Sequence, residues 1–532
     1  MKRSDQRRRQ QGGAKLLALL LACASVASCI VLVWAQSYGL LQRVRPRRAG
    51  GGQTITVKAR GDLQAALNSA QPGDTIVLEA GATYTGPFTL PRKTGDAFIN
   101  VQSSRLSELP GEGQRVAPAH APLMPKIVSP GGGQSALKTA PGAHHFRFTG
   151  IEFAPANESA FLYHVIALGD VGQAQDTLDE VPHHLIFDRC YIHAFPNQDL
   201  RRGVMLNSAD TDITNCYISD FKTKGADSQA VAGWNGPGPY RIVNNYLEAS
   251  GENLIFGGSD PSIPNLVPSD IEVRKNYFSK PLSWRGVWTV KNLFELKNAR
   301  RVVVDGNLME YNWGDAQMGE AILFTVRNQD GASPWSVVED VQFTNNLIRH
   351  VGGGVNVLGH DYYHPSEPTR RITISNNVFD DVDGERWNGR GEFLLMTERA
   401  TEITLDHNTV RHTGSVAMAG AGPHTGLVFT NNVLSHNQYG VHGDGTGSGN
   451  QTFEKYFPGA VVRRNVIAGA QAANYPPDNF YPASLDAVGF VDLLRGNYRL
   501  RADSKFRGRG TDGKDVGCDL DALEAALPAG AR

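Results

Sequence analysis

A short pattern of apolar and polar residues recurs along the chain. Two or three apolar residues are followed by two polar residues, an asparagine and two further apolar residues, as in Arg-Ile-Val-Asn-Asn-Tyr-Leu at residues 241–247. The asparagines that mark the pattern stand at spacings of 31, 31, 39, 31, 31, 24 and 33 residues. They are Asn245, Asn276, Asn307, Asn346, Asn377, Asn408, Asn432 and Asn465. A repeat of this length indicates a solenoid.

The repeats predict short strands and no long helices. Leucines do not stand at the fixed offsets of leucine-rich repeats, and the two-residue hairpin turns of propeller blades are missing. A coil of three short strands joined by turns fits a repeat of 24–31 residues, and the 39-residue repeat then carries a longer loop. Stacked coils place equivalent residues in columns, about 4.8 Å apart. The sequence therefore predicts an all-β fold, a parallel β-helix.

The repeated asparagines have a structural explanation. An asparagine that points inward at a bend can bond backbone groups of its own coil and the side-chain amide of the next coil. We therefore expect a ladder of buried amides, and these asparagines are assigned no catalytic role. Cys190 and Cys216 fall on the same position of earlier coils, 26 residues apart, and are expected as small buried replacements. A disulfide between them is the less favoured alternative.

Both ends of such a stack need covering, because terminal strands expose apolar edges and unpaired backbone groups. Asp62–Asn68 predicts a short amphipathic helix whose first residue is the N-cap and whose buried side holds Leu63 and Leu67. Asp519–Leu527 predicts a second capping helix.

The N-terminal segment predicts export from the cytoplasm. Residues 1–15 carry six basic side chains and one acidic one, and the uncharged, mostly apolar run over 16–35 would span about 30 Å as a helix. The positive-inside rule keeps the basic flank in the cytosol and sends the remainder across the membrane. A retained anchor and a cleaved signal peptide remain open alternatives, with a lipoprotein signal less favoured. The protein is expected to be extracytoplasmic, either secreted or membrane-anchored through this segment.

The expected organisation has four parts. Residues 1–35 form the basic stub with the signal or anchor helix, and residues 36–53 form a flexible linker rich in arginine and glycine. Residues 54–500 form the β-helix, and residues 501–532 form a C-terminal cap.

Composition narrows the classes of function. The net charge of the 532 residues is −1, which excludes a general nucleic-acid binder because such proteins need a clustered basic excess. The chain has 58 glycines spread over its length, and 41% of its residues are hydrophobic. A disordered low-complexity chain is therefore excluded as well. We expect a monomer.

Four segments resemble bacterial proteins of the pectin-lyase-like superfamily. Residues 61–67 read Gly-Asp-Leu-Gln-Ala-Ala-Leu, and residues 72–84 read Pro-Gly-Asp-Thr-Ile-Val-Leu-Glu-Ala-Gly-Ala-Thr-Tyr. Residues 496–500 read Gly-Asn-Tyr-Arg-Leu, and residues 510–517 read Gly-Thr-Asp-Gly-Lys-Asp-Val-Gly. With the asparagine pattern, the resemblance covers about residues 54–527. It implies a right-handed β-helix, the usual hand of parallel crossovers.

For function, the resemblance implies a polysaccharide partner but no particular reaction. The superfamily holds lyases, hydrolases, epimerases and non-enzymatic binders. Polygalacturonase-like hydrolases show Asn-Thr-Asp, Asp-Asp, Gly-His-Gly and Arg-Ile-Lys in order, whereas this chain has Asp380-Asp381 with partial echoes at residues 359–361 and 441–443. The Arg-x-Pro-x-x-Arg element of pectate lyases is absent. No active site is therefore carried over from the family.

An outward strip of polar residues is the candidate site. Residues 293–298 read Leu-Phe-Glu-Leu-Lys-Asn and match Leu-Phe-Thr-Val-Arg-Asn at 323–328, 30 residues later. Strand alternation sends inward Phe294, Leu296, Phe324 and Val326, and sends outward Glu295, Lys297, Thr325 and Arg327. Asn356 is expected to continue the strip beyond Thr325.

The two cations of this strip suggest a reaction. Lys297 and Arg327 would be like charges on neighbouring coils, which is unfavourable unless an anion such as a uronic-acid carboxylate lies there. β-Elimination needs a base for the C5 proton and a cation beside the carboxylate. Lys297 is the candidate base, Arg327 the candidate neutraliser and Glu295 their companion. The alternative is that both cations extend into water at the strand end.

Long loops beside this strip supply further candidates. His360 is an alternative base. Trp288, Trp313 and Tyr362 can stack on sugar rings, and Asn356 can bind substrate hydroxyls. The alternative for each tryptophan is that it folds back over its own loop.

Carboxylates leave two more possibilities open. Glu252, Glu295, Glu320 and Glu392 are candidates for the facing pair of a glycoside hydrolase. Asp380, Asp381, Asp383 and Glu385 make an acidic run whose oxygens suit Ca²⁺, although a solvated turn is favoured and no specific motif supports a metal. A non-catalytic, glycan-binding envelope protein is the third class of function.

Overall fold

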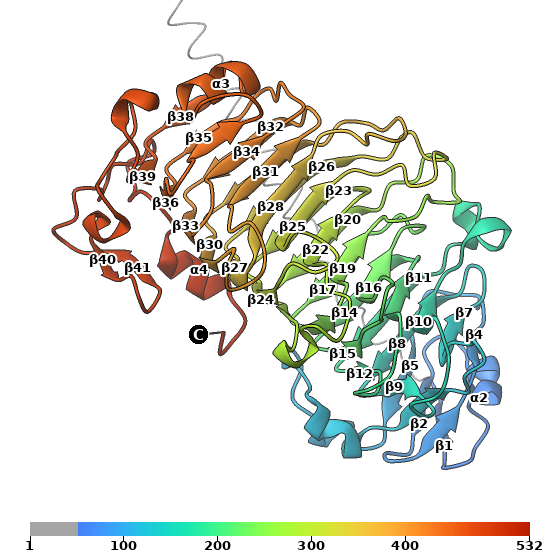
Figure 1. Ribbon diagram of the computed structural model, residues 1–532. Helices are drawn as coiled ribbons and strands as arrows, with labels where there is room; N and C mark the ends of the chain where they lie inside the picture. The colour runs from blue at the N-terminus through green and yellow to red at the C-terminus, as the bar shows by residue number, and fades with distance from the viewer. Residues whose placement is uncertain (1–51, 532) are drawn as a thin grey trace, which may run out of the picture. The chain divides into compact units, whose positions relative to one another are not determined.

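The computed structural model describes residues 52–531, which form three long parallel sheets (Figure 1). Each coil contributes one strand to each sheet, and the stack is a right-handed parallel β-helix, which confirms the fold prediction. The expected signal or anchor helix and most of the linker lie outside the described residues. Within them, no helix is both long and apolar enough to cross a membrane.

The strands are grouped by sheet, in stacking order. Sheet A holds β1 (Thr54–Val57), β2 (Thr75–Leu78), β5 (Ile99–Ser103), β8 (His144–Thr149), β11 (His183–Asp188), β14 (Ala209–Thr214), β17 (Tyr240–Val243), β20 (Ser269–Arg274), β23 (Ala299–Asp305), β26 (Val338–Thr344), β29 (Arg370–Ser375), β32 (Thr401–Asp406), β35 (Val428–Thr430) and β38 (Val461–Arg463). Sheet B holds β3 (Thr83–Thr85), β6 (Lys126–Ser129), β9 (Glu152–Pro155), β12 (Tyr191–His193), β15 (Tyr217–Phe221), β18 (Tyr246–Ala249), β21 (Tyr277–Ser279), β24 (Leu308–Asn312), β27 (Leu347–Val351), β30 (Val378–Val382), β33 (Thr409–His412), β36 (Val433–Ser435) and β39 (Val466–Ala468). Sheet C holds β4 (Phe88–Leu90), β7 (Leu137–Thr139), β10 (His164–Leu168), β13 (Arg202–Leu206), β16 (Gln229–Gly233), β19 (Glu252–Phe256), β22 (Asn292–Leu296), β25 (Glu320–Thr325), β28 (Gly353–Leu358), β31 (Leu394–Thr397), β34 (Ala417–Ala419) and β37 (Val441–Gly443).

The remaining elements are short. β40 (Phe490–Asp492) and β41 (Asn497–Leu500) form an antiparallel pair. The helices are α2 (Leu63–Ser69), α3 (Asn450–Tyr456) and α4 (Leu520–Ala526). Short 3₁₀ segments lie at Leu106–Glu108, Pro118–Leu123, Gly172–Ala174, Leu178–Glu180, Leu282–Trp284, Ala472–Asn474 and Leu485–Val488.

The asparagine ladder runs through the turns between sheets A and B. In each rung the side-chain oxygen of one asparagine accepts from the backbone N–H and the side-chain amide of the asparagine before it, at 2.8 and 3.0 Å between Asn346 and Asn377. The ladder runs from Asn245 through Asn465 and ends on Asn479, which the sequence pattern missed. Because every amide in it is buried and bonded, the expected structural role is confirmed.

The residue before each ladder asparagine lies in the left-handed region of backbone space. Asn345, Asn376 and Asn431 have φ values of 55°, 54° and 59°, and Gly306 has the same conformation at 65°. Asparagine tolerates this region better than most residues. The local requirement therefore explains the Asn-Asn pairs that recur in the sequence.

Two cysteines continue the ladder toward the N-terminus. Cys216 donates its backbone N–H to Asn245 Oδ1 at 2.8 Å, and Cys190 donates its own to Cys216 Sγ at 3.3 Å. Both are fully buried and both are free thiols. The expectation of small buried replacements is confirmed, and the structure has no disulfide between them.

Helix α2 covers the N-terminal end of the stack, beside β4 (Figure 1). Its N-cap Asp62 accepts from the Ala65 N–H at 2.8 Å, and Leu63 and Leu67 are buried as predicted. At the other end α3 contacts β37, and its Phe453 and Tyr456 join the main core.

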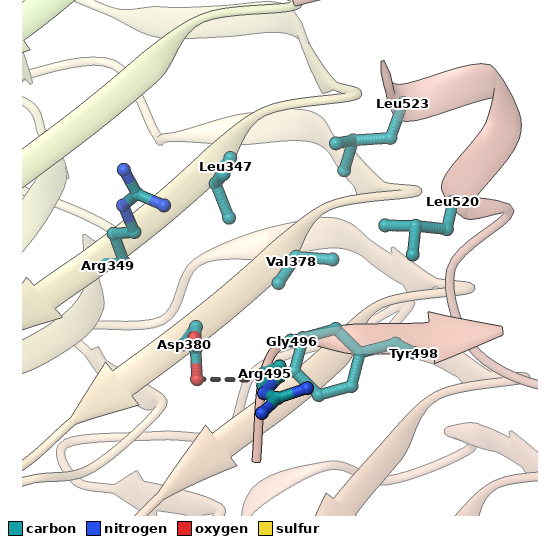
Figure 2. Close-up of a pocket in the computed structure, with 9 residues that line it drawn as sticks. All are labelled: Leu347, Arg349, Val378, Asp380, Arg495, Gly496, Tyr498, Leu520 and Leu523. Carbon is teal, nitrogen blue, oxygen red and sulfur yellow. Dashed lines mark hydrogen bonds between the residues drawn. The ribbon is translucent and has the colours of Figure 1, made fainter. Parts of the chain in front are cut away.

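Helix α4 forms where the sequence predicts it, with Asp519 as N-cap, but it lies on the outer face of sheet B and not over the end of the stack. Figure 2 shows its Leu520 and Leu523 turned toward Leu347 and Val378 of that face. This face has an apolar column because its outward residues meet the C-terminal segment and not water. The C-terminal segment therefore covers part of sheet B.

Candidate active site on sheet C

The outer face of sheet C is bordered by long loops on both sides. The connections from sheet B to sheet C include residues 280–291, 313–319 and 383–393. The connections from sheet C to sheet A include residues 326–337 and 359–369. A rigid sheet flanked by long loops is a common location for binding and catalytic residues.

The predicted alternation of the central strands is confirmed, but their register is not. Phe294, Leu296, Phe324 and Val326 are fully buried in the core. Glu295 lies opposite Leu323, and Asn356 also pairs with Leu323, so the expected pairing of Thr325 with both is wrong by two residues. Because the shift is even, every side chain keeps its face. The outward column thus reads Glu295, Leu323 and Asn356.

A polar network crosses the first residues of β13, β16, β19 and β22. Arg202 Nε donates to Gln229 Oε1 at 2.6 Å, and Gln229 Nε2 donates to Glu252 Oε2 at 2.7 Å. On the next strand, Asn292 Nδ2 donates to Glu295 Oε2 at 3.1 Å. These polar side chains hold one another at fixed positions on the sheet.

Two lysines at the ends of β22 compensate the buried acids of this network. Lys291 Nζ lies 2.5 Å from Asp227 Oδ1 and 3.3 Å from Glu252 Oε1. Lys297 Nζ lies 3.6 Å from Glu295 Oε1, beyond hydrogen-bond distance. Glu295 Oε1 instead accepts from Thr325 Oγ1 at 3.1 Å. Lys291 is thus firmly held, whereas Lys297 is the more loosely paired cation.

The ion pairs fix the charge of Lys291. Burial alone would lower its pKa, but Glu252 and the hydrogen-bonded Asp227 raise it well above the usual value. The pKa of Glu252 is raised by burial and by the neighbouring charge of Glu295, while Lys291 and Lys297 act in the opposite direction. Lys291 is therefore a permanent cation beside carboxylates that are costly to ionise.

Arg327 has a different partner from the one expected. Its Nη1 lies 3.1 Å from Asp361 Oδ1, and its Nη2 donates to the Tyr362 hydroxyl at 3.0 Å. The guanidinium also lies 4.4 Å from the centre of the Tyr362 ring. The anion beside Arg327 in this structure is therefore a carboxylate of the protein, contributed by the loop after β28.

The other loop candidates divide into exposed and buried groups. Tyr362 is 55% exposed and remains available to a ligand, whereas Trp313 is 2% exposed. Trp313 packs with Trp284 and Trp387, so the alternative, a tryptophan folded into its own loop wall, describes it better than sugar stacking. Trp288 is partly buried at the edge of the same cluster.

His360 is not joined to the lysines. Its Nδ1 lies 3.1 Å from the carbonyl oxygen of Glu398, two strands beyond Arg327 on the sheet C side. Among the described residues, no hydrogen bond or ion pair connects His360 with Lys297 or Glu295. The structure therefore gives no support to His360 as the base for a reaction at Lys297.

Two further carboxylates face each other across a glycine. Glu320 lies opposite Gly353 on the next strand, and Glu392 lies beside Gly353 on the strand after that. Burial raises the pKa of Glu392 to about 7, with Arg390 lowering it and Glu320 raising it further. Burial also raises the pKa of Glu320. Without a side chain at Gly353, the two carboxyl groups influence each other directly.

The raised pKa of Glu392 predicts a pH-dependent stability. A carboxyl group whose pKa rises on folding stabilises the fold below about pH 4.5, and this contribution is lost as the pH rises through 7. Glu392→Gln should therefore gain about 3 kcal/mol relative to the wild type between pH 4.5 and pH 8. Urea unfolding of both proteins at the two pH values measures this, with Glu385→Gln on the exposed turn as the matched control. An equal difference at both pH values would contradict the prediction.

The acidic run at 380–385 does not converge on a common point. Asp380 pairs with Arg411 and accepts from the Tyr498 hydroxyl at 2.7 Å, as Figure 2 shows for Tyr498. Asp381 pairs with His350 and Arg386. Asp383 accepts backbone N–H groups of its own turn. The run thus supplies separate ion pairs and a turn, in agreement with the favoured alternative to a Ca²⁺ site.

Comparison with solved structures places the fold. An alginate lyase of polysaccharide lyase family 6, AlyGC, aligns with a TM-score of 0.54 at 15% identity over 90% of this chain. The chain spans 59% of the length of that protein. A mannuronic-acid-specific family 6 lyase from human gut microbiota aligns with a TM-score of 0.51 at 14% identity, over 82% of this chain and 92% of the other. This chain has the pectin-lyase-like fold. No protein-family model matches it, and no curated protein sequence does.

Sequence reasoning missed several members of the network on this pectin-lyase-like β-helix. Lys291, Asp227 and Gln229 lie at the ends of loops or on the first residue of a strand, where alternation is not yet established. A signal was present in the spacing: Gln229, Glu252 and Asn292 each precede an apolar strand that ends near a glycine or lysine. Stacking those strands would have aligned the three polar side chains.

Proposed function

We propose that the chain is an exported polysaccharide lyase that acts on a uronate-containing polymer at the outer face of sheet C. The observation that carries the proposal is the pair of lysines at the two ends of β22. Lys291 is held between two carboxylates, and Lys297 is in loose contact with one. One fixed cation and one less constrained amine on the same strand are the groups that elimination from a uronate requires.

In the proposed reaction Lys297, as the free amine, takes the C5 proton of the uronate. The C5–H electron pair forms the C4=C5 double bond, the C4–O bond breaks, and the departing oxygen gains a proton. Lys291 neutralises the substrate carboxylate, so that charge developing next to C5 is stabilised. Glu295 and Thr325 position the strip, since Glu295 is bonded to Asn292, Thr325 and, at longer range, Lys297. Arg327 moves from the role of neutraliser to the rim, with Asp361 and Tyr362.

A substrate panel tests the proposal. The wild-type chain is incubated with alginate, pectate and glycosaminoglycans, and the ultraviolet absorbance of the new C4=C5 bond is followed alongside the release of reducing ends. Both signals should rise together on at least one polymer. Reducing ends without the absorbance would replace the lyase by a hydrolase, and neither signal would leave a non-catalytic binder.

The hydrolase is the second candidate because of Glu320 and Glu392. A carboxyl group with a pKa of about 7 is protonated often enough at neutral pH to act as a general acid. The second carboxyl group across Gly353 would be its partner. Both side chains are almost fully buried beneath the loops, which is why the lyase is preferred.

The exposed ring of Tyr362 should contribute to substrate binding. Removal of a stacking ring costs about 1.4 kcal/mol, so Tyr362→Ala should raise KM about 10-fold and leave kcat unchanged. Tyr163→Ala is the matched control, because Tyr163 is similarly exposed and precedes β10, four strands away from β22 on sheet C. Initial rates over a range of polymer concentrations measure both constants. A fall in kcat with unchanged KM would remove Tyr362 from the binding surface.

A further inference from the structure

Four histidines form a compact square at the start of two neighbouring strands of sheet A, away from the sheet C face. His144 and His145 begin β8, His183 and His184 begin β11, and His144 pairs in register with His183. The rings of His144 and His183 stack at 4.8 Å, and those of His145 and His184 stack at 4.3 Å. All four side chains are only partly buried, so the cluster can be reached from solvent.

Within each strand the two rings meet through their nitrogens. Nδ1 of His144 lies 2.7 Å from Nδ1 of His145, and the same atoms of His183 and His184 are also 2.7 Å apart. One ring nitrogen from each of His145, His183 and His184 lies within 4.8 Å of the other two. Three imidazoles around one metal ion at about 2.0 Å would hold their nitrogens roughly 3.4 Å apart. Small rotations of the side chains bring the cluster to that geometry.

The outer nitrogens of the cluster are anchored as in metal sites. His184 Nε2 lies 2.8 Å from Asp210 Oδ2, on the next strand β14, and His144 Nε2 lies 2.9 Å from the carbonyl oxygen of Lys93. Metal-binding histidines commonly donate their second ring N–H to a carboxylate or carbonyl, which fixes the ring and the tautomer. Here these anchors leave Nδ1 of His144 and His184 facing the neighbouring rings.

The same column is filled differently farther along the stack. In later coils the residue at the equivalent left-handed position is charged and paired, as Asp270 with Arg301 and Asp340 with Arg371. In the first two coils it is His145 and His184, whose uncharged rings stack without an opposite charge between them. The histidines thus replace a repeating ion pair with a set of soft nitrogen ligands.

We propose that His145, His183 and His184 bind one divalent transition-metal ion, with Zn²⁺ as the representative, and that Asp210 positions His184. Imidazole ligands suit Zn²⁺, Cu²⁺ and Ni²⁺ better than Ca²⁺ or Mg²⁺. The ion joins β8 to β11, and Asp210 extends the linkage to β14. Its role is structural: it ties together three coils of the N-terminal part of the stack.

Metal binding by the full chain, prepared without an added histidine tag and stripped with a chelator, tests the proposal. Calorimetric titration with Zn²⁺ should give one ion per chain. His145→Ala and His184→Ala should weaken binding at least 100-fold, and Asp210→Asn should weaken it about 10- to 100-fold. His364→Ala, on the loop after β28, is the matched control and should bind as the wild type does.

Two further measurements keep the result independent of folding defects. Co²⁺ added to the wild type should give the visible absorption of a nitrogen-ligated ion, and Zn²⁺ should raise the thermal midpoint of the wild type but not that of His145→Asn. Lack of saturable binding by the wild type would overturn the proposal. Binding that survives unchanged in His145→Ala and His184→Ala, with far-ultraviolet circular dichroism like that of the wild type, would overturn it as well.

Discussion

Lys297→Ala should lower kcat for uronate elimination by about 10³-fold, because a positioned general base contributes on the order of 10² to 10⁴ in rate. KM should change little, since Lys291 and the Arg327–Tyr362 rim remain to bind the polymer. Lys297→Arg should lose nearly as much, because a guanidinium keeps the charge but cannot give up its proton at neutral pH. The double-bond absorbance measured under saturating polymer decides the result.

Lys138→Ala is the matched control for this change. Lys138 is an exposed lysine that also points outward from sheet C, on β7, five strands away from β22. It should retain the wild-type rate. A Lys297→Ala protein that folds as the wild type does and keeps its kcat would remove Lys297 from the reaction and leave the sheet C face without its base.

The features that the sequence predicted depend on short-range regularities. The ladder asparagines recur at nearly constant spacing, and each follows a residue that must adopt a left-handed conformation, so both the period and the turn are written locally. The alternation of Phe294 and Leu296 with Glu295 is equally local, because successive side chains of a strand point to opposite faces. The start of α2 was predictable from Asp62 for the same reason.

The features that the sequence did not predict depend on register and on loops. Leu293–Asn298 and Leu323–Asn328 look alike, yet the strands pair with an offset of two residues, because β25 begins at Glu320 after a loop of different length. The partner of Arg327, Asp361, comes from a loop two strands away. Nothing local to Arg327 indicates that carboxylate, and nothing local to Trp313 indicates that Trp284 and Trp387 enclose it.

The position of α4 shows the same limit at a larger scale. Its amphipathic pattern predicted a helix with one apolar side, but the apolar surface that receives it was not identified. The receiving residues, such as Leu347 and Val378, follow ladder asparagines in the repeat and look like ordinary strand residues. Only the stacked structure shows that they point away from the main core.

Asn377→Ala should lower the stability of the coils around it by about 4 kcal/mol. Asn377 Oδ1 accepts from the backbone and the side chain of Asn346, and its Nδ2 donates to the Phe343 carbonyl at 2.9 Å and to Asn408 Oδ1 at 3.0 Å. Truncation leaves several of these buried groups without partners, at about 1 to 3 kcal/mol each. Asn157→Ala, on an exposed loop, is the control and should stay within about 0.5 kcal/mol of the wild type.

Because stacked repeats can unfold in parts, a single unfolding midpoint would not locate the loss. Hydrogen exchange resolved by segment should show faster exchange across β26, β29 and β32, the strands that flank the ladder turns of Asn346, Asn377 and Asn408. The first coils, where Cys190 and Cys216 occupy the ladder, should exchange as in the wild type. Uniform loosening along the whole stack would show instead that the ladder acts as one cooperative unit, contrary to the rung-by-rung bonding of its amides.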